Sequence, residues 1–381
     1  MANSTKSDGQ HEVSLPELAG RLVLICARSV PPVIGGEEGQ VSRLCNVLVR
    51  AGARVEVWTT TAAPALPRGV RTHVRPRLFA AMPLYLGWLC LSVALRRTAT
   101  AGVPAVLITT KVSGDSALLA RISRVLRITV VIFLTGGLVG GSEFSLQRRP
   151  WVKRWIVTGS SAAVAHAEAF LDELKQAGFS GTTTRIGTIV DGLDLGQTCL
   201  EQLPTTPGSP ALIWCGRNDP VKDLPALFRL FEGRLQGVGA PSLLVVIDEP
   251  PENAPAGAVV HLRCPMPRAH MASADVLLVT SRFEGQGAVI AEAAVEGTPC
   301  VAYGVGGVPE TMGRLDGGAI VPLGASDADY ADAVGRVWKR FGDPAERTAL
   351  AHRASQQFER DPPEAWVQLL TRVSRSRSEE A

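Results

Sequence analysis

"RLVLICARSVPPVIGGEEGQVSRLCNVLVRAGARVEVWTT", residues 21–60, predicts a strand, a glycine-containing loop, a helix and a second strand. The two apolar runs in this segment lack polar alternation, which is typical of parallel strands that are covered by helices on both faces. Runs of this kind recur along the chain, so we expect two doubly wound α/β domains. The other expected strands are 104–110, 128–134 and 154–160 in the first half, and 211–216, 242–248, 258–262, 275–280 and 300–304 in the second.

The chain has 381 residues, which is enough for two domains of ordinary size. A segment rich in Thr, Pro and Gly marks the hinge between them. The last helix follows a proline pair and can pack on either domain. We expect a disordered polar tail over 1–20, a first domain over 21–195, the hinge at 196–210, a second domain over 211–360, and a C-terminal helix with a basic tail over 361–381.

Composition and charge exclude several classes of function. The 39 basic and 36 acidic residues leave a net charge of +3, which is too small for nucleic-acid binding through phosphate neutralisation. The seven cysteines include no C-x-x-C pair and indicate reduced, buried thiols in a cytosolic protein. The six histidines include no H-x-H or H-E-x-x-H pair, so a zinc site has little support. The polar first residues do not match a secretory signal, and we expect a cytoplasmic protein.

One apolar run raises the question of a membrane. Residues 79–95 are uncharged and are flanked by arginines, but 17 residues that contain Pro83 fall short of the span of about 20 that a bilayer requires. A buried helix is the favoured interpretation, and a spanning helix is the least favoured. Shallow contact with a membrane surface is the alternative, and the basic and aromatic stretch at 148–155 supports it.

Glycines follow the first expected strand. Gly35, Gly36 and Gly39 precede the first expected helix, where backbone amides at a helix start favour an anion. The pattern is not G-x-G-x-x-G, so a nicotinamide site is poorly supported. An ordinary strand-to-helix turn is the alternative.

Two cations follow the first strand of the second half. In "CGRNDPVKD", residues 215–223, Arg217 and Lys222 share one short loop, and Asp223 can cap the next helix. Two cations at the carboxyl end of a strand can neutralise a diphosphate. A solvated surface pair is the alternative.

Two carboxylates accompany a third loop. In "SRFEGQGAVIAEAAVEGTPC", residues 281–300, Glu284 precedes an expected helix and Glu292 lies about one turn inside it. Each carboxylate can accept the hydrogen bonds that sugar or ribose hydroxyls donate. The alternative is that Glu284 caps the helix and that Glu292 shares a wet face with Glu296. The next loop, residues 304–310, adds glycines and Glu310.

Together these segments resemble the GT-B glycosyltransferases of the retaining family 4 type. Glu284 and Glu292 are similar to that family's E-x7-E motif, and "GRNDPVKD" is similar to its G-R-x(4)-K segment. "IGTIVDGLDL", residues 186–195, resembles the loop that closes the family's first domain. The likeness runs from about residue 21 to 323. It implies a GT-B fold, with two Rossmann-like doubly wound domains that face each other across a cleft.

The resemblance also implies roles for these residues. Glu284 would touch hydroxyls of the donor sugar, and Glu292 would hold the ribose. Arg217 and Lys222 would bind the diphosphate and stabilise it as it leaves, which makes Glu284, Arg217 and Lys222 the catalytic set. No metal ion or other cofactor is implied. The remaining residues that would contact the donor are Gly36, Gly285, Gln286 and Gly287.

The chain departs from the family pattern at three places. An aromatic residue is usual where Gln286 stands, and Asn is common where Asp191 stands. A histidine is frequent at the end of the fourth strand, where Thr135 and Gly136 would here position the acceptor or the sugar. The implied reaction is a retaining transfer from a nucleotide-sugar to a hydroxyl acceptor of unknown class. The alternatives are a nucleotide-sugar epimerase and a catalytically inactive binding or scaffold protein with the same fold.

Overall fold

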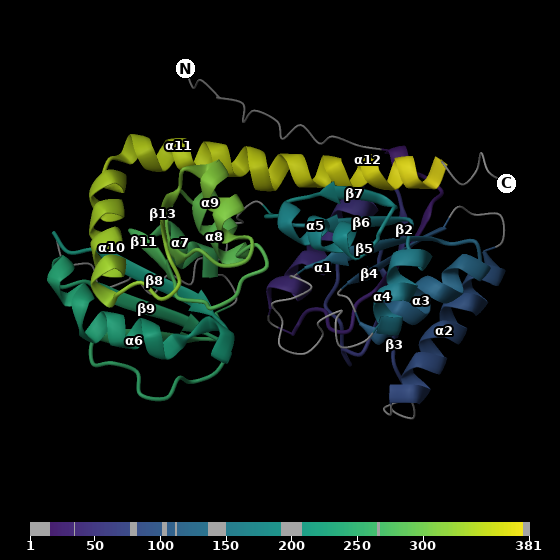
Figure 1. The fold of residues 1–381 in the computed structure, drawn as a ribbon, viewed down its shortest axis with the longest axis horizontal. Coiled ribbons are helices and arrows are strands. Elements are labelled where there is room, and N and C mark those ends of the chain that lie inside the picture. The colour runs from purple at the N-terminus through teal and green to yellow at the C-terminus, as the bar shows by residue number, and fades with distance from the viewer. Residues whose placement is uncertain are drawn as a thin grey trace, which may run out of the picture.

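The structure is a computed structural model that describes residues 16–33, 35–76, 82–100, 105–110, 113–135, 150–191, 208–264 and 267–375. Two α/β domains lie side by side, and the last helices run along one side of both (Figure 1). Each domain contains a parallel sheet with helical connections, as the apolar runs predict.

The first domain contains a seven-stranded sheet in the order β3-β2-β1-β4-β5-β6-β7. Neighbouring strands are parallel, and β1 pairs with β2 on one side and with β4 on the other. The strands are β1 (Leu22–Cys26), β2 (Arg54–Thr59), β3 (Arg71–Val74), β4 (Ala105–Thr110), β5 (Thr129–Leu134), β6 (Ala162–Ala165) and β7 (Thr182–Arg185).

The second domain contains a six-stranded sheet in the order β10-β9-β8-β11-β12-β13. It is parallel as well, with β8 between β9 and β11. The strands are β8 (Ala211–Gly216), β9 (Ser242–Ile247), β10 (Ala258–Leu262), β11 (Val276–Val279), β12 (Cys300–Tyr303) and β13 (Gly318–Val321).

The described helices connect the strands and cover the sheets. Those of the first domain are α1 (Gly36–Arg50), α2 (Met82–Ala99), α3 (Gly114–Val125), α4 (Pro150–Gly159) and α5 (Glu168–Gln176). Those of the second domain are α6 (Leu224–Glu232), α7 (Pro267–Ala272), α8 (Ala288–Val295), α9 (Val308–Leu315), α10 (Asp327–Phe341) and α11 (Pro344–Ser355). Short 3-10 helices span Pro16–Leu18, Pro220–Lys222 and Arg234–Val238.

One expected strand is wrong. Residues 154–160 lie mostly in α4, where Val152 and Ile156 are buried at a spacing of four residues while Arg154 is exposed. The strand that belongs at this place is β6, a short run of three alanines and a valine that strand propensity does not predict. β3, β7 and β13 were likewise not expected. Each contains only four residues.

The C-terminal helix returns to the first domain. After α11 the chain makes a π-helical turn, Gln356–Arg360, and continues as α12 (Asp361–Arg375), in line with α11 (Figure 1). Trp366 of α12 is buried in the core of the first domain, and its ring meets that of Phe133 edge-on at 5.1 Å. Burial of a large side chain contributes about 2 kcal/mol. The sequence left the position of this helix open, and the packing determines it.

The prediction of a disordered tail over 1–20 is wrong for its last residues, because Pro16–Leu18 form a 3-10 helix. Leu18 is buried against the first domain, and its backbone N–H donates to the carbonyl of Ala51 at 3.2 Å. Residues 1–15, residues 192–207 with most of the expected hinge, and residues 376–381 lie outside the described ranges.

α2 accounts for the apolar run at 79–95. Leu89 and Val93 are buried against the first sheet, whereas Leu91 and Leu95 are 61% and 60% exposed. One apolar face of α2 is therefore buried as predicted, while leucines on the opposite face are exposed. Across the described ranges, no helix has the length and apolarity that crossing a membrane requires.

Candidate functional site

The expected site residues follow strands at the point where each sheet reverses its winding. β1 lies beside β4 in the first sheet, and β8 lies beside β11 in the second. Ligands of doubly wound sheets bind at such switch points, beyond the carboxyl ends of the strands. Arg217 and Lys222 follow β8, Glu284 follows β11, and Gly36 follows β1.

Lys222 and Glu284 form an ion pair. Lys222 Nζ donates to Glu284 Oε1 at 2.6 Å, and Ser281 Oγ donates to the same oxygen at 2.7 Å. The side chains are 23% and 8% exposed, so both charges lie largely out of water. The Lys222 backbone is held as well, because Thr280 Oγ1 donates to its carbonyl at 3.0 Å.

Asp223 orients the loop that carries these cations. As the sequence predicts, its carboxylate caps α6 by accepting from the Ala226 N–H at 3.3 Å. Arg282, which is largely exposed, donates to the other oxygen of this carboxylate at 2.6 Å. The loop between β8 and α6 is therefore anchored at its end.

The glycines of residues 304–310 bring two loops into contact. The Gly307 N–H donates to the carbonyls of Glu284 and Gly285 at 3.2 and 3.0 Å. Gly306 has a φ of +53°, and a Cβ at this residue would overlap the Glu284 carbonyl oxygen. Only glycine fits there, and its close approach supports the backbone of Glu284.

The glycine loop of the first domain faces the second domain. A Cβ at Gly35 would lie 3.6 Å from Arg217 Nη1, and a Cβ at Gly36 would lie 3.8 Å from the Ala288 Cβ. Ala288 is the first residue of α8, whose N-terminal amides form a positive end. The carboxyl edges of the two sheets therefore meet around Arg217 and the start of α8.

Glu292 is paired across the domains. Arg43 of α1 donates through Nη2 to Glu292 Oε1 at 2.8 Å, and its Nε lies 3.4 Å from Asp191 Oδ2. Arg43 also donates to the Ile189 carbonyl at 3.2 Å. The carboxylate that the family resemblance assigns to ribose is thus held by a cation of the opposite domain.

Gln286 also joins the domains. Its side-chain oxygen accepts from the Thr188 N–H at 2.7 Å, and the Gln286 side chain is buried. Its neighbour Gly287 has a φ of +76° and directly precedes α8, at the N-cap position. The residue that replaces the family's usual aromatic is therefore engaged with residues 186–191 of the first domain.

Glu310 and Arg268 complete the contact between the domains. Glu310 caps α5 of the first domain by accepting from the N–H groups of Glu168 and Ala169 at 3.0 and 3.2 Å. Arg268 of α7 donates to the Asp191 carbonyl and to Glu296. The alternative in which Glu292 and Glu296 share a wet face is wrong, because Glu296 is paired and its side chain is only 13% exposed.

Burial raises the pKa of two thiols near the site. Burial, together with the negative charge of Glu292, raises the pKa of Cys215 well above its usual range. Burial, with Glu284 nearby, does the same to the pKa of Cys300. A raised pKa disfavours the thiolate, which is the nucleophilic form of cysteine. Cys45 and Cys300 are buried as predicted, whereas four other cysteines are only half-buried: Cys26, Cys90, Cys215 and Cys264. Cys199 lies outside the described residues.

Family models match both domains. The model described as "Glycosyl transferases group 1" matches residues 210–340, and the one described as "Glycosyl transferase 4-like domain" matches residues 35–186. These ranges contain Gly36, Arg217, Lys222, Glu284 and Glu292.

The chain belongs to the group 1 glycosyltransferases.

Solved structures agree with this fold. Sucrose-phosphate synthase from Thermosynechococcus elongatus superposes with a TM-score of 0.70 at 18% identity, over 95% of this chain and 100% of that one. Anabaena HepE in complex with UDP-glucose superposes with a TM-score of 0.65 at 17% identity, over 94% and 100% of the two chains. The predicted GT-B fold, with two Rossmann-like domains, is confirmed.

Matches to curated sequences are local. D-inositol 3-phosphate glycosyltransferase from Mycobacteroides abscessus is 39% identical over 82 residues, which are 22% of this chain and 18% of that protein. Granule-bound starch synthase 1 from Triticum aestivum is 31% identical over 132 residues, which are 32% and 22% of the two chains. The chain therefore spans less than a quarter of the length of either relative.

The structure assembles most of the predicted set. It pairs Lys222 with Glu284 and places Arg217 against the glycine loop, while Glu292 is reached from the first domain instead. Thr135 is half-buried and follows β5 at the carboxyl edge of the first sheet. Gly136 lies outside the described residues.

Three polar residues of α1 were missed. Glu38 is buried and accepts from Ser29 Oγ at 2.6 Å. Gln40 exchanges two hydrogen bonds with the Ile189 backbone, at 2.8 and 2.9 Å. Gly36, Gln40 and Arg43 are spaced by four and three residues, which places them on one face of a helix. This spacing could have indicated from the sequence that Gln40 and Arg43 lie on the same helix face as the glycine loop.

Proposed function

We propose that this group 1 glycosyltransferase is a retaining enzyme that moves a sugar from a nucleoside diphosphate donor to an acceptor hydroxyl. The observation that carries the proposal is the convergence of Arg217, Lys222 and Glu284 at the switch point of the second sheet, opposite the glycine loop of the first.

In the proposed reaction, Arg217 and Lys222 bind the diphosphate. The bond between the anomeric carbon and the phosphate oxygen breaks, and the acceptor oxygen bonds to that carbon on the face that the leaving group vacates. The acceptor proton passes to the departing phosphate oxygen. Because negative charge grows on the diphosphate as it leaves, preorganised cations stabilise the transition state more than the ground state.

The pairing of Lys222 with Glu284 supports two proposed tasks for Glu284. Its Oε1 holds the ammonium group in place, and the carboxylate retains further lone pairs for sugar hydroxyls. Two protein cations then supply the charge that a divalent metal would supply at a diphosphate. We therefore propose that transfer does not require a metal ion.

A uridine diphosphate sugar is the first donor to test. HepE, which shares this fold, was solved in complex with UDP-glucose. Glu292 would bind the ribose diol of such a donor, and this requires it to exchange or share its contact with Arg43. Donor binding would therefore alter the interdomain ion pair.

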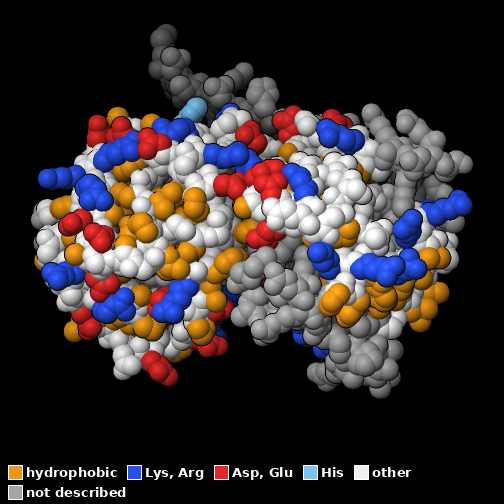
Figure 2. Space-filling view, viewed as in Figure 1, with side chains coloured by type: hydrophobic (Ala, Val, Ile, Leu, Met, Phe, Trp, Pro, Cys, Tyr) orange, Lys and Arg blue, Asp and Glu red, His pale blue; other side chains and the backbone are white. Residues whose placement is uncertain are grey.

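We also propose that the acceptor is reached at a membrane surface, on the inner face of a cytoplasmic membrane. Leu91 and Leu95 of α2 and Trp151 of α4 are exposed apolar side chains of the first domain, and α4 also carries Lys153. Figure 2 shows apolar and basic side chains close together on this part of the molecule. Such a surface suits the interface of an anionic membrane.

The membrane proposal predicts sedimentation with phosphatidylglycerol vesicles and weaker sedimentation with phosphatidylcholine vesicles. The variant Leu91→Ser/Leu95→Ser should lose this binding. Leu323→Ser, at a leucine of the second domain that is 55% exposed, should retain it. Equal binding by both variants would contradict the proposal.

The central test is release of a nucleoside diphosphate. A thermal-shift screen of UDP-, GDP- and dTDP-sugars identifies the donor, since a ligand that binds only the folded state raises the melting temperature. The bound donor is then incubated with candidate acceptors, and nucleoside diphosphate is measured. The folded variant Arg217→Met/Lys222→Met controls for contaminating hydrolases. If no donor shifts the melting temperature or yields a diphosphate, the proposal fails.

A further inference from the structure

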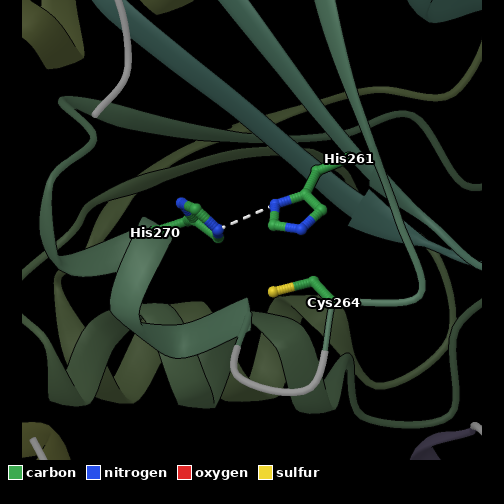
Figure 3. A group of neighbouring side chains, drawn as sticks. All are labelled: His261, Cys264 and His270. Carbon is green, nitrogen blue, oxygen red and sulfur yellow. Dashed lines mark hydrogen bonds between the residues drawn. The ribbon is translucent and has the colours of Figure 1, made fainter. Parts of the chain in front are cut away.

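Three potential metal ligands meet at the edge of the second sheet. His261 lies on β10, Cys264 follows this strand, and His270 lies on α7. Their ligand atoms all lie within 4.8 Å of one another. Figure 3 shows the rings of His261 and His270 pointing toward each other, with the sulfur of Cys264 directed toward both.

The distances suit a small ion. His261 Nδ1 and His270 Nε2 are 3.0 Å apart, and the rings are edge-on at 73° rather than stacked. Ligands around a tetrahedral zinc ion lie about 3.3–3.6 Å from one another, given bond lengths of about 2.0–2.3 Å. Small side-chain rotations would therefore admit an ion between the three groups.

The chemistry of the set points to a particular class of metal. Two imidazoles and one thiolate match the preference of zinc, whereas magnesium and calcium prefer oxygen ligands. His270 is 2% exposed and the other two residues are half-buried, so an ion would be partly shielded from water. A water molecule could complete the fourth position.

We propose that His261, Cys264 and His270 bind a zinc ion that fixes α7 to the edge strand β10. The proposal revises the expectation that the chain holds no metal. The spacing of these residues, H-x2-C-x5-H, contains no C-x-x-C, H-x-H or H-E-x-x-H pair. Arg217 and Lys222 already supply positive charge at the proposed diphosphate site, so we assign this ion a structural role and leave the proposed transfer reaction without a catalytic metal.

The position of α7 gives the ion a consequence. Arg268 lies on this six-residue helix, two residues before His270, and joins the Asp191 carbonyl of the first domain to Glu296 of the second. A short helix is marginal by itself. An ion that ties α7 to β10 would therefore hold Arg268 in place between the domains.

The competing interpretation is a hydrogen bond between two neutral histidines, in which Cys264 takes no part. Cys264→Ser separates the two, because it removes the thiolate and leaves both imidazoles. His261→Asn removes a half-buried ligand and serves as a second variant. His352→Asn, at an exposed histidine of α11, is the matched control.

The test uses tag-free, full-length protein. We expect about one zinc ion per chain after purification without chelator, because three protein ligands and one water molecule complete a tetrahedral set. Chelation should lower the melting temperature and accelerate amide exchange in residues 267–272. Cobalt substitution should produce a thiolate-to-cobalt charge-transfer band. Cys264→Ser should lose this band and bind zinc at least about tenfold more weakly, and His261→Asn should also bind zinc more weakly. His352→Asn should behave as wild type.

Either of two results would overturn the proposal. The first is wild-type protein that neither retains zinc nor shifts its melting temperature when Zn²⁺ is added. The second is a Cys264→Ser variant with wild-type zinc affinity. Neither readout depends on glycosyl transfer, so failure of this proposal and failure of the proposed enzyme activity are distinguishable.

Discussion

Substitution of Lys222 by methionine is the sharpest perturbation of the proposed site. Methionine has a length similar to that of lysine but carries no charge, so it retains packing and removes the cation. At 2.6 Å and an effective dielectric constant of about 20, Lys222 and Glu284 attract each other by about 6 kcal/mol before desolvation is subtracted. Both groups lose water when they pair, so we expect a net coupling of about 1–3 kcal/mol.

The same cation would also face the leaving diphosphate. Loss of one preorganised group that stabilises developing charge lowers turnover by about tenfold to a thousandfold, or about 1.4–4 kcal/mol of transition-state stabilisation. We therefore expect Lys222→Met to reduce kcat/KM by at least about tenfold. Steady-state kinetics with the donor found by thermal shift measure this loss.

The control and the coupled variant sharpen the test. Arg229→Met removes another cation of the second domain, one that pairs with Asp327 and is 60% exposed, and it should leave kcat/KM unchanged. If Glu284 positions Lys222, the double variant Lys222→Met/Glu284→Gln should lose less than the sum of the single losses. Additive losses would refute the positioning, and a folded Lys222→Met enzyme with near-wild-type kcat/KM would refute the site.

Further predictions concern other parts of the molecule. Glu292→Ala should lower kcat/KM at least about tenfold, mainly through the KM of the donor, and wild-type kinetics would show that Glu292 does not bind donor. Gly306→Ala should lower the melting temperature and abolish activity, because a Cβ at this residue would overlap the Glu284 carbonyl oxygen. Gly313→Ala in α9 should do neither, because a Cβ there would have no atom within 4 Å. Equal behaviour of the two variants would contradict this prediction. Burial lowers the pKa of His166 to about 4, so the folded state keeps it neutral while the unfolded state binds a proton below about pH 6.5. The free energy of unfolding, measured with denaturant, should therefore fall by about 3 kcal/mol between pH 6.5 and about pH 4. His166→Asn should remove this dependence on pH. An unchanged dependence in the variant would mean that another group titrates.

The architecture was largely predictable because burial on both faces leaves a direct trace in the sequence. Continuous apolar runs such as 21–27 and 242–248 correspond to β1 and β9. The trace fails where a short strand consists mostly of alanine, as in β6, or where β-branched residues occupy a helix, as in α4. In both cases, packing against the sheet determined the secondary structure, and the local propensity of the residues did not.

The donor site was predictable in its parts. Arg217, Lys222 and Glu284 each follow a strand, and the rule that ligands bind beyond the carboxyl ends of parallel strands brings them together. Their partners were not predictable. Arg43 and Glu292 are separated by 249 residues, and Gln286 and Thr188 by 98.

Taken alone, the sequence determined the fold class, the two sheets and the loops that carry the donor-binding residues, because each depends on periodicity and on side-chain chemistry along the chain. The tertiary structure alone decided that α12 packs on the first domain, that Arg43 reaches Glu292, and that the side chains of His261, Cys264 and His270 converge. These contacts depend on how two separately formed surfaces meet. Periodicity states which face of an element is available, but it does not state what that face will touch.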